Sequence, residues 1–132
     1  MNNSNLNSAT QLAGRIMMSF IFIMAGISKI GAYAGTQGYM ESVGLPGILL
    51  PAVILLELAG GLAILLGWQT RIAALLLAGF SIVSAVIFHA NFADQIQMIL
   101  FMKNIAMAGG LLFLVAGATH DWSIDGKRKT NG

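Results

Sequence analysis

The sequence contains no cysteine and very few charged residues. The absence of cysteine excludes disulfides, thiolate metal sites and cysteine-held iron–sulfur clusters. Only 9% of the 132 residues are charged, whereas soluble domains carry about 25%. So few charges cannot cover a water-facing surface, and a net charge of +2 without a basic groove pattern argues against a nucleic-acid partner. We therefore predict a single membrane domain over residues 1–132.

Hydrophobic residues take the place of the missing charges, at 57% of the chain and a mean hydropathy of +0.80. They gather in four stretches, each near the ~20 residues that a spanning helix needs. After a flexible N-terminus (residues 1–11), we expect transmembrane helices at 12–30, 48–67, 72–92 and 98–118. A soluble bundle would show a polar face on every helix, but the third stretch offers only Ser81 and Ser84 up to Phe88. The predicted fold is all-α, with four transmembrane helices in an antiparallel bundle.

The connections and the basic residues predict how the chain lies in the bilayer. Residues 31–47 form a long, glycine-rich loop, whose middle fits a short interfacial helix. Four spans place both ends of the chain on one side of the membrane. That side holds five basic residues and the other side two: Arg15, Arg71, Lys127, Arg128 and Lys129 against Lys29 and Lys103. The positive-inside rule then makes the termini and the tail of residues 119–132 cytoplasmic, and residues 31–47 an outer loop.

Glu57 is the most informative charge, because it stands at the middle of the second stretch. At ~1.5 Å of rise per residue it would lie roughly 13–15 Å from either membrane surface. An ionisable group at that depth costs at least ~2.5–3.5 kcal/mol, so we expect it to face a partner or a cavity. Gly60 and Gly61 share its face and would let a neighbouring helix approach closely. Two interpretations stay open: a structural ion pair, or a proton carrier or ligand anchor.

Polar residues on the other helices are the candidate partners of this carboxylate. Arg15 lies near the inner end of the first helix and Lys103 near the outer end of the fourth, with Glu57 between them in depth. Both side chains are long enough to lean toward it, although simple snorkelling of charges near helix ends is the alternative. We predict a buried polar pocket made of six residues: Glu57, Arg15, Lys103, Asn104, Lys29 and His89.

No intrinsic cofactor and no metal site are expected. His89 and His120 would lie a membrane thickness apart, so they cannot ligate one haem iron within a chain. His89 and Asp94 are five residues apart and point in different directions on a helix. Dinucleotide, phosphate-loop and zinc motifs are absent. Small residues four apart, such as Ala106 and Gly110, fit packing within one bundle or the seam of a homodimer.

Several short motifs along the chain match those of a known family. They are Arg15, Ala25-Gly26 with Lys29, Tyr33-Ala34-Gly35-Thr36-Gln37, Leu45-Pro46-Gly47, Leu55-Leu56-Glu57-Leu58-Ala59-Gly60-Gly61, Thr70-Arg71, Phe88-His89 with Asn91-Phe92, and Phe101-Met102-Lys103-Asn104. Over about residues 12–125 the chain resembles the DoxX family of small bacterial inner-membrane proteins, in its YqjF-like branch. It departs from the family where the fourth helix ends, with Gly117-Ala118-Thr119 in place of a Gly-Pro-Gly turn.

The resemblance implies a four-helix plasma-membrane protein, and it favours one of three functions. Some members are described as subunits of quinone-linked sulfur oxidation or as partners of redox and detoxification enzymes. The chain would then be a quinone-interacting subunit, in which Lys103, Asn104 and Arg15 donate hydrogen bonds and Glu57 exchanges protons. The alternatives are a small-molecule binder or proton-coupled transporter, and a non-catalytic membrane anchor for a partner enzyme. Whether the chain has enzymatic activity of its own stays open.

The predicted orientation can be tested with reporter fusions. Alkaline phosphatase fused after residue 132 is expected to be inactive, because this enzyme matures only outside the cytoplasm. A fluorescent protein at the same position is expected to fluoresce, and phosphatase inserted within residues 31–47 to be active. Phosphatase activity from the C-terminal fusion would reverse the proposed topology.

Overall fold

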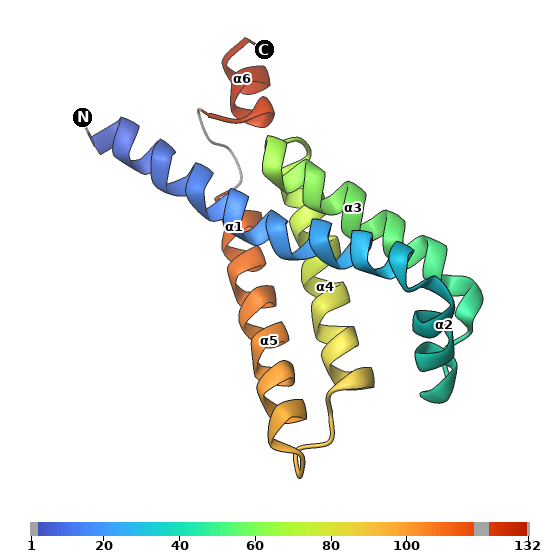
Figure 1. The fold of residues 1–132 in the computed structure, drawn as a ribbon. Coiled ribbons are helices and arrows are strands. Elements are labelled where there is room, and N and C mark those ends of the chain that lie inside the picture. The colour runs from blue at the N-terminus through green and yellow to red at the C-terminus, as the bar shows by residue number, and fades with distance from the viewer. Residues whose placement is uncertain (1–2, 118–121, 132) are drawn as a thin grey trace.

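Helices make up all the regular structure that the computed structural model describes, which is residues 3–117 and 122–131. In chain order they are α1 (Asn3–Gly31), α2 (Tyr33–Ser42), the 3-10 turn η1 (Gly47–Leu49), α3 (Leu50–Leu66), α4 (Thr70–Phe88), α5 (Gln95–Ala116) and α6 (Ile124–Asn131), as Figure 1 shows. Four of these segments are long and apolar enough to cross a membrane: residues 5–31 of α1, η1 together with α3, α4, and α5. The prediction of an all-α chain with four spans is therefore confirmed.

The ends of the helices differ from the predicted ones. The first helix begins at Asn3, so residues 3–11 are helical instead of flexible; no glycine or proline interrupts them. The third span ends at Phe88, four residues earlier than expected. The last span begins at Gln95 instead of residue 98, because Asp94 caps it by accepting a hydrogen bond from the backbone N–H of Ile96 at 3.0 Å.

The segment between α1 and η1 contains the short helix that the sequence predicted. α2 ends at Ser42, and Gly44 follows with φ of 88°, a left-handed conformation that glycine adopts without steric cost. The Gln37 side chain on α2 donates a hydrogen bond to the carbonyl of Gly47 at 3.0 Å. This bond ties α2 to the start of the second span.

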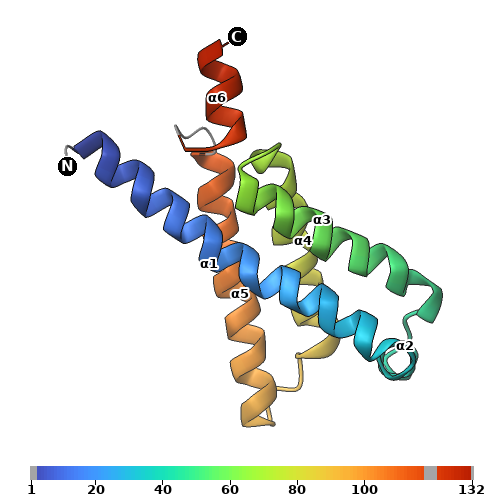
Figure 2. The same cartoon turned by 45° about the horizontal axis from the view of Figure 1, so that its top comes forward.

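The four spans pack as two antiparallel pairs that cross each other. Figures 1 and 2 show α1 lying along α3, and α4 lying along α5, with the first pair running obliquely over the second. The predicted antiparallel arrangement therefore holds within each pair, while the pairs cross. Small residues permit the crossing: Ala74 and Ala78 on α4 are buried at the centre of the core, together with Leu77.

Gly61 on α3 lies at a close contact between α1 and α3. A Cβ atom placed on this glycine would lie 2.8 Å from Cγ1 of Ile23, 3.3 Å from its backbone nitrogen and 3.3 Å from the carbonyl oxygen of Ser19. Two of these neighbours are backbone atoms, which cannot turn away as a side chain can. The close approach that the glycine pair predicted is thus present between these two helices.

Replacing Gly61 by alanine is expected to destabilise the protein. The added methyl group forces α1 away from α3, which costs about 1–3 kcal/mol, as other overpacked cores do. Gly79→Ala is the matched control, because Gly79 is also helical but a Cβ there meets nothing within 4 Å. Unfolding in detergent measures both variants. Equal stability of the two would show that the α1–α3 contact tolerates a side chain at this position.

Candidate functional site

An ion pair between the partly buried Lys29 and the buried Glu57 joins α1 to α3. Glu57 is 3% exposed, and its Oε1 lies 2.8 Å from Nζ of Lys29. Apart from this ion pair, the oxygen has no hydrogen-bond partner in the described part of the chain. Gly26, one turn before Lys29, allows the contact, since a Cβ there would lie 2.7 Å from Cγ of Leu58 and 3.6 Å from Cβ of Glu57. The cation that meets the carboxylate therefore comes from α1.

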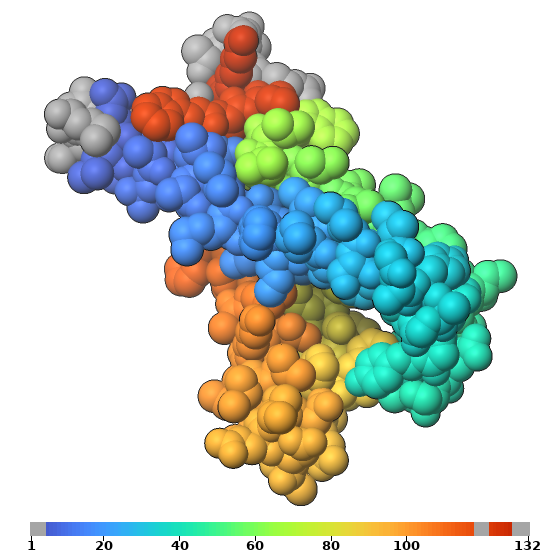
Figure 3. Space-filling model, viewed as in Figure 1, coloured from blue at the N-terminus to red at the C-terminus, as the bar shows by residue number. Residues whose placement is uncertain are grey.

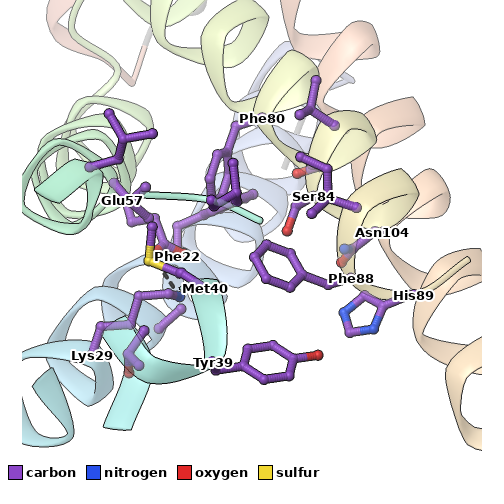
Figure 4. Close-up of a pocket in the computed structure, with 18 of the residues that line it drawn as sticks. Phe22, Lys29, Tyr39, Met40, Glu57, Phe80, Ser84, Phe88, His89 and Asn104 are labelled. Carbon is purple, nitrogen blue, oxygen red and sulfur yellow. Dashed lines mark ion pairs between the residues drawn. The ribbon is translucent and has the colours of Figure 1, made fainter. Parts of the chain in front are cut away.

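A cavity of about 450 Å³ adjoins this ion pair. Its walls come from all four spans and from α2, and most of them are apolar. Phe22, Met40 and Phe80 are among the lining side chains that separate the ion pair from the far wall (Figure 4). On the surface, an opening is visible between the α1–α2 side of the molecule and the α4–α5 side (Figure 3). The volume lies within the ~300–1,000 Å³ that is typical of small-molecule pockets.

A second polar group lies across the cavity, where α4 ends and α5 runs beside it. His89 and Asn104 both line the cavity there, opposite Lys29 and Glu57 (Figure 4). Nδ1 of His89 lies 2.8 Å from Oε1 of Gln97. Because that amide oxygen only accepts, the ring donates through Nδ1, and Nε2 is then the acceptor of the neutral ring. The hydrogen bond thus fixes the orientation of the imidazole.

Ser81 is a cavity residue that the sequence prediction did not include. It is 2% exposed, and its Oγ has no hydrogen-bond partner among the described residues. Ser84, one turn further along α4, lines the same cavity. The sequence did point to both serines, because they are the only polar residues in the body of the third span and they share one helix face. An unpaired buried hydroxyl beside a cavity is a ready hydrogen-bonding group for a bound molecule.

Arg15 does not join this site, which corrects the predicted cluster. It is 1% exposed near the opposite end of α1, where its Nη2 donates to the carbonyl of Trp122 at 2.5 Å and its Nη1 to that of Leu65 at 3.4 Å. The Leu65 carbonyl belongs to the last turn of α3, whose carbonyls lack partners within the helix. Arg15 therefore links α1 to the end of α3 and to the segment before α6, far from Glu57 along both helices.

The start of α6 strengthens this link. The carboxylate of Asp125 accepts hydrogen bonds from the backbone nitrogens of Gln69 at 2.9 Å and Thr70 at 2.8 Å. It thereby satisfies free N–H groups at the beginning of α4 and places a negative charge at the positive end of the helix dipole. The predicted cytoplasmic tail therefore contains a helix that is fastened to the turn between α3 and α4.

Lys103 also lies outside the cavity, in a second correction. Its side chain is exposed on α5, whereas the adjacent Asn104 faces the cavity. Successive residues on an α-helix are turned by about 100°, so Asn104 can face the cavity while Lys103 points away from it. Of the six predicted residues, the structure brings four to the cavity: Glu57, Lys29, His89 and Asn104.

Among residues 3–117 and 122–131, no three His, Cys, Asp or Glu side chains come close enough to hold a metal ion. His120, the other histidine considered for haem binding, lies outside the described residues.

These features define a small multi-pass membrane protein with a ligand-sized cavity beside an ion pair whose carboxylate is buried. Comparison with known proteins gives its family: the DoxX profile matches residues 10–90, and the chain belongs to the DoxX family.

Three relatives support the assignment. The chain is 52% identical to inner membrane protein YqjF of Escherichia coli K12 over 86% of its own length and 88% of that protein. It is 35% identical to inner membrane protein YphA of the same strain, over 86% of each chain. It is 33% identical to "Putative oxidoreductase CatD" of Bacillus subtilis 168, over 72% of this chain and 75% of that one. No solved structure matches. The relatives and the four apolar helices identify a multi-pass inner-membrane protein of the YqjF-like type.

The ion pair predicts how the stability of the protein changes when one or both of its charges are removed. Lys29→Met leaves the Glu57 carboxylate buried without its cation and is expected to cost about 3–5 kcal/mol. Adding Glu57→Leu in the same chain removes the uncompensated charge, so the double variant is expected to regain most of that loss. Denaturation in mixed micelles gives the free energy of unfolding of the wild type, the single variant and the double variant.

Lys103→Met is the control for this series, because it removes an exposed lysine from another span. Its stability is expected to match that of the wild type. A Lys29→Met variant as stable as Lys103→Met would contradict a stabilising or compensating role for Lys29.

Proposed function

We propose that the cavity binds a small, planar, mostly apolar molecule that carries hydrogen-bonding atoms at two opposite ends. A quinone is the chemical class that fits this description best. The carrying observation is the placement of Lys29 with Glu57 on one wall and of His89 with Asn104 on the other, with aromatic and aliphatic side chains between them.

The two polar walls suit the two carbonyl oxygens of a quinone. The Lys29 ammonium has three N–H donors, and one suffices for the ion pair with Glu57. The amide of Asn104 offers two donors on the opposite wall. The Oγ of Ser81, which lacks a partner among the described residues, adds a third contact.

The same two walls also carry groups that can exchange the protons of quinone reduction. Converting a quinone to a quinol takes two electrons and two protons, one for each oxygen. Glu57 and His89 lie on opposite walls, and in the states described above the carboxylate and Nε2 of the neutral imidazole are proton acceptors. Each can take a proton from a bound quinol or, once it has been protonated from the solvent, give one to a bound quinone. The chain has no cysteine for an iron–sulfur centre, so the electrons are assigned to a partner redox enzyme. The printed name of the Bacillus relative, which refers to an oxidoreductase, supports this association.

We accordingly propose that this protein is a quinone-interacting subunit of a redox or detoxification system in the inner membrane. A proton-coupled transporter and a membrane anchor without a ligand are the competing functions. An anchor would not bind a quinone, so the binding measurement below distinguishes an anchor from a quinone-binding subunit directly. A transporter would instead move its solute across the membrane of vesicles.

Quinone binding tests the proposal. Short-chain benzoquinone and naphthoquinone are expected to raise the midpoint of thermal unfolding of the purified protein. Asn104→Leu removes one donor and is expected to raise the apparent Kd about five- to tenfold, as the loss of one hydrogen bond of about 1–1.4 kcal/mol would. Lys103→Leu, at the neighbouring exposed position, is expected to leave the Kd unchanged. Failure of every quinone to shift the wild-type midpoint would refute the proposal.

A further inference from the structure

Two apolar side chains mark where the cavity meets the outside of the protein. Leu49, at the end of η1, and Val83, on α4, both line the cavity, and yet they are 44% and 55% exposed. A side chain that contacts the cavity and is also exposed borders an opening. Val53 and Ile87, which are partly buried, continue the same apolar lining inward. We call the apolar part of the cavity's rim that contains Leu49 and Val83 the lateral opening.

The residues of the lateral opening belong to two of the candidate membrane spans. Val83 precedes the end of α4 at Phe88 by five residues, which is about 7–8 Å along the helix at ~1.5 Å per residue. Leu49 also belongs to a segment that is apolar enough to span the membrane. The neighbouring exposed residues on α4, Ile82 and Val86, are hydrocarbon as well. An apolar rim on two candidate membrane spans fits an opening toward the acyl chains of the bilayer.

Aromatic rings occupy the end of the cavity that is nearest the end of α4. Tyr39 of α2 stacks on Phe88 with ring centroids 5.2 Å apart and an angle of 21° between the planes, and both line the cavity. His89 follows directly and is held to α5 through Gln97. Figure 4 shows the Tyr39 and Phe88 rings side by side at this end. Tyr39 is itself 48% exposed, so this end of the cavity also reaches the outside of the protein, but beside a phenol and an imidazole instead of aliphatic side chains alone.

We propose that the ligand is a membrane-dissolved amphiphile whose polar ring fills the cavity and whose long hydrocarbon tail leaves through the lateral opening into the bilayer. The inference rests on the proposed function and adds the class of ligand and its route. A cavity of about 450 Å³ accommodates a ring with small substituents, whereas a long isoprenoid chain needs space outside it. The apolar rim at Leu49 and Val83 supplies the surface on which that chain lies.

Tryptophan substitutions at the opening test this inference. Val83→Trp narrows the opening and is expected to raise the apparent Kd for a long-chain quinone at least fivefold. The Kd for the same ring without a tail is expected to change less than twofold, because the ring itself occupies the inner cavity. Both values are measured by ligand-dependent thermal unfolding of the full-length protein in the same detergent.

The chain offers a matched control on the same helix. Val86 is 57% exposed, close to the 55% of Val83, but it does not line the cavity, so Val86→Trp is expected to change neither Kd. If Val83→Trp fails to fold, Leu49→Trp takes its place, with Ile48→Trp as control; Ile48 is 81% exposed and does not line the cavity either.

The outcomes separate the two proposals. Selective loss of the tailed ligand in Val83→Trp or Leu49→Trp, with the controls unchanged, supports the lateral route. Equal effects on tailed and tail-less quinones, or no effect on either, overturn it while quinone binding by the wild type still stands. Absence of binding by the wild type to any quinone rejects the proposed function itself, and with it the inference.

Discussion

The ion pair between Lys29 and Glu57 is the interaction on which the arrangement of this protein depends. A carboxylate at the middle of an apolar span is costly to expose to lipid, and Glu57 is only 3% exposed. The structure meets this constraint with one lysine from the neighbouring span, at 2.8 Å. That contact fixes how α1 lies on α3, and the glycines at 26 and 61 permit the approach. Because the pair borders a cavity, it also sets the polarity of one wall, so the same two charges serve both packing and the candidate site.

The two ends of the molecule have different structures, and the cavity follows from that difference. At one end, α3 and α4 are joined by a tight turn in which Gly67 has φ of 68°. Arg15 and Asp125 fasten this turn to the segment around α6. From there α3 and α4 diverge, as Figure 1 shows, and the space between their far ends is bordered by α2. A firmly held joint at one end and a helix inserted at the other can keep such a space open without a rigid bundle along the whole length.

The relatives and the cavity contribute different parts of the functional argument. The relatives establish a DoxX protein of the inner membrane, and one of them carries a name that refers to an oxidoreductase. The cavity supplies a physical reason for a membrane-soluble ligand, since its two polar walls are separated by apolar side chains and its opening is bordered by hydrocarbon. In the proposed scheme the protein holds the ligand and relays protons, while a partner supplies electrons.

The sequence by itself determined the class, the number of spans and the need to shelter Glu57, because these follow from local hydropathy and the cost of burying a charge. It also indicated the α2 helix and the close approach at Gly61. Tertiary structure alone decided which cation meets the carboxylate. Judged by depth in the membrane alone, Arg15 and Lys103 were equally plausible partners of Glu57. Depth, however, does not tell how each helix is rotated or which helices are neighbours. Rotation turns Lys103 outward and Asn104 inward, and the α6 segment, distant in sequence, engages Arg15. Ser81 became notable for the same reason, since only packing shows that its hydroxyl lacks a partner among the described residues.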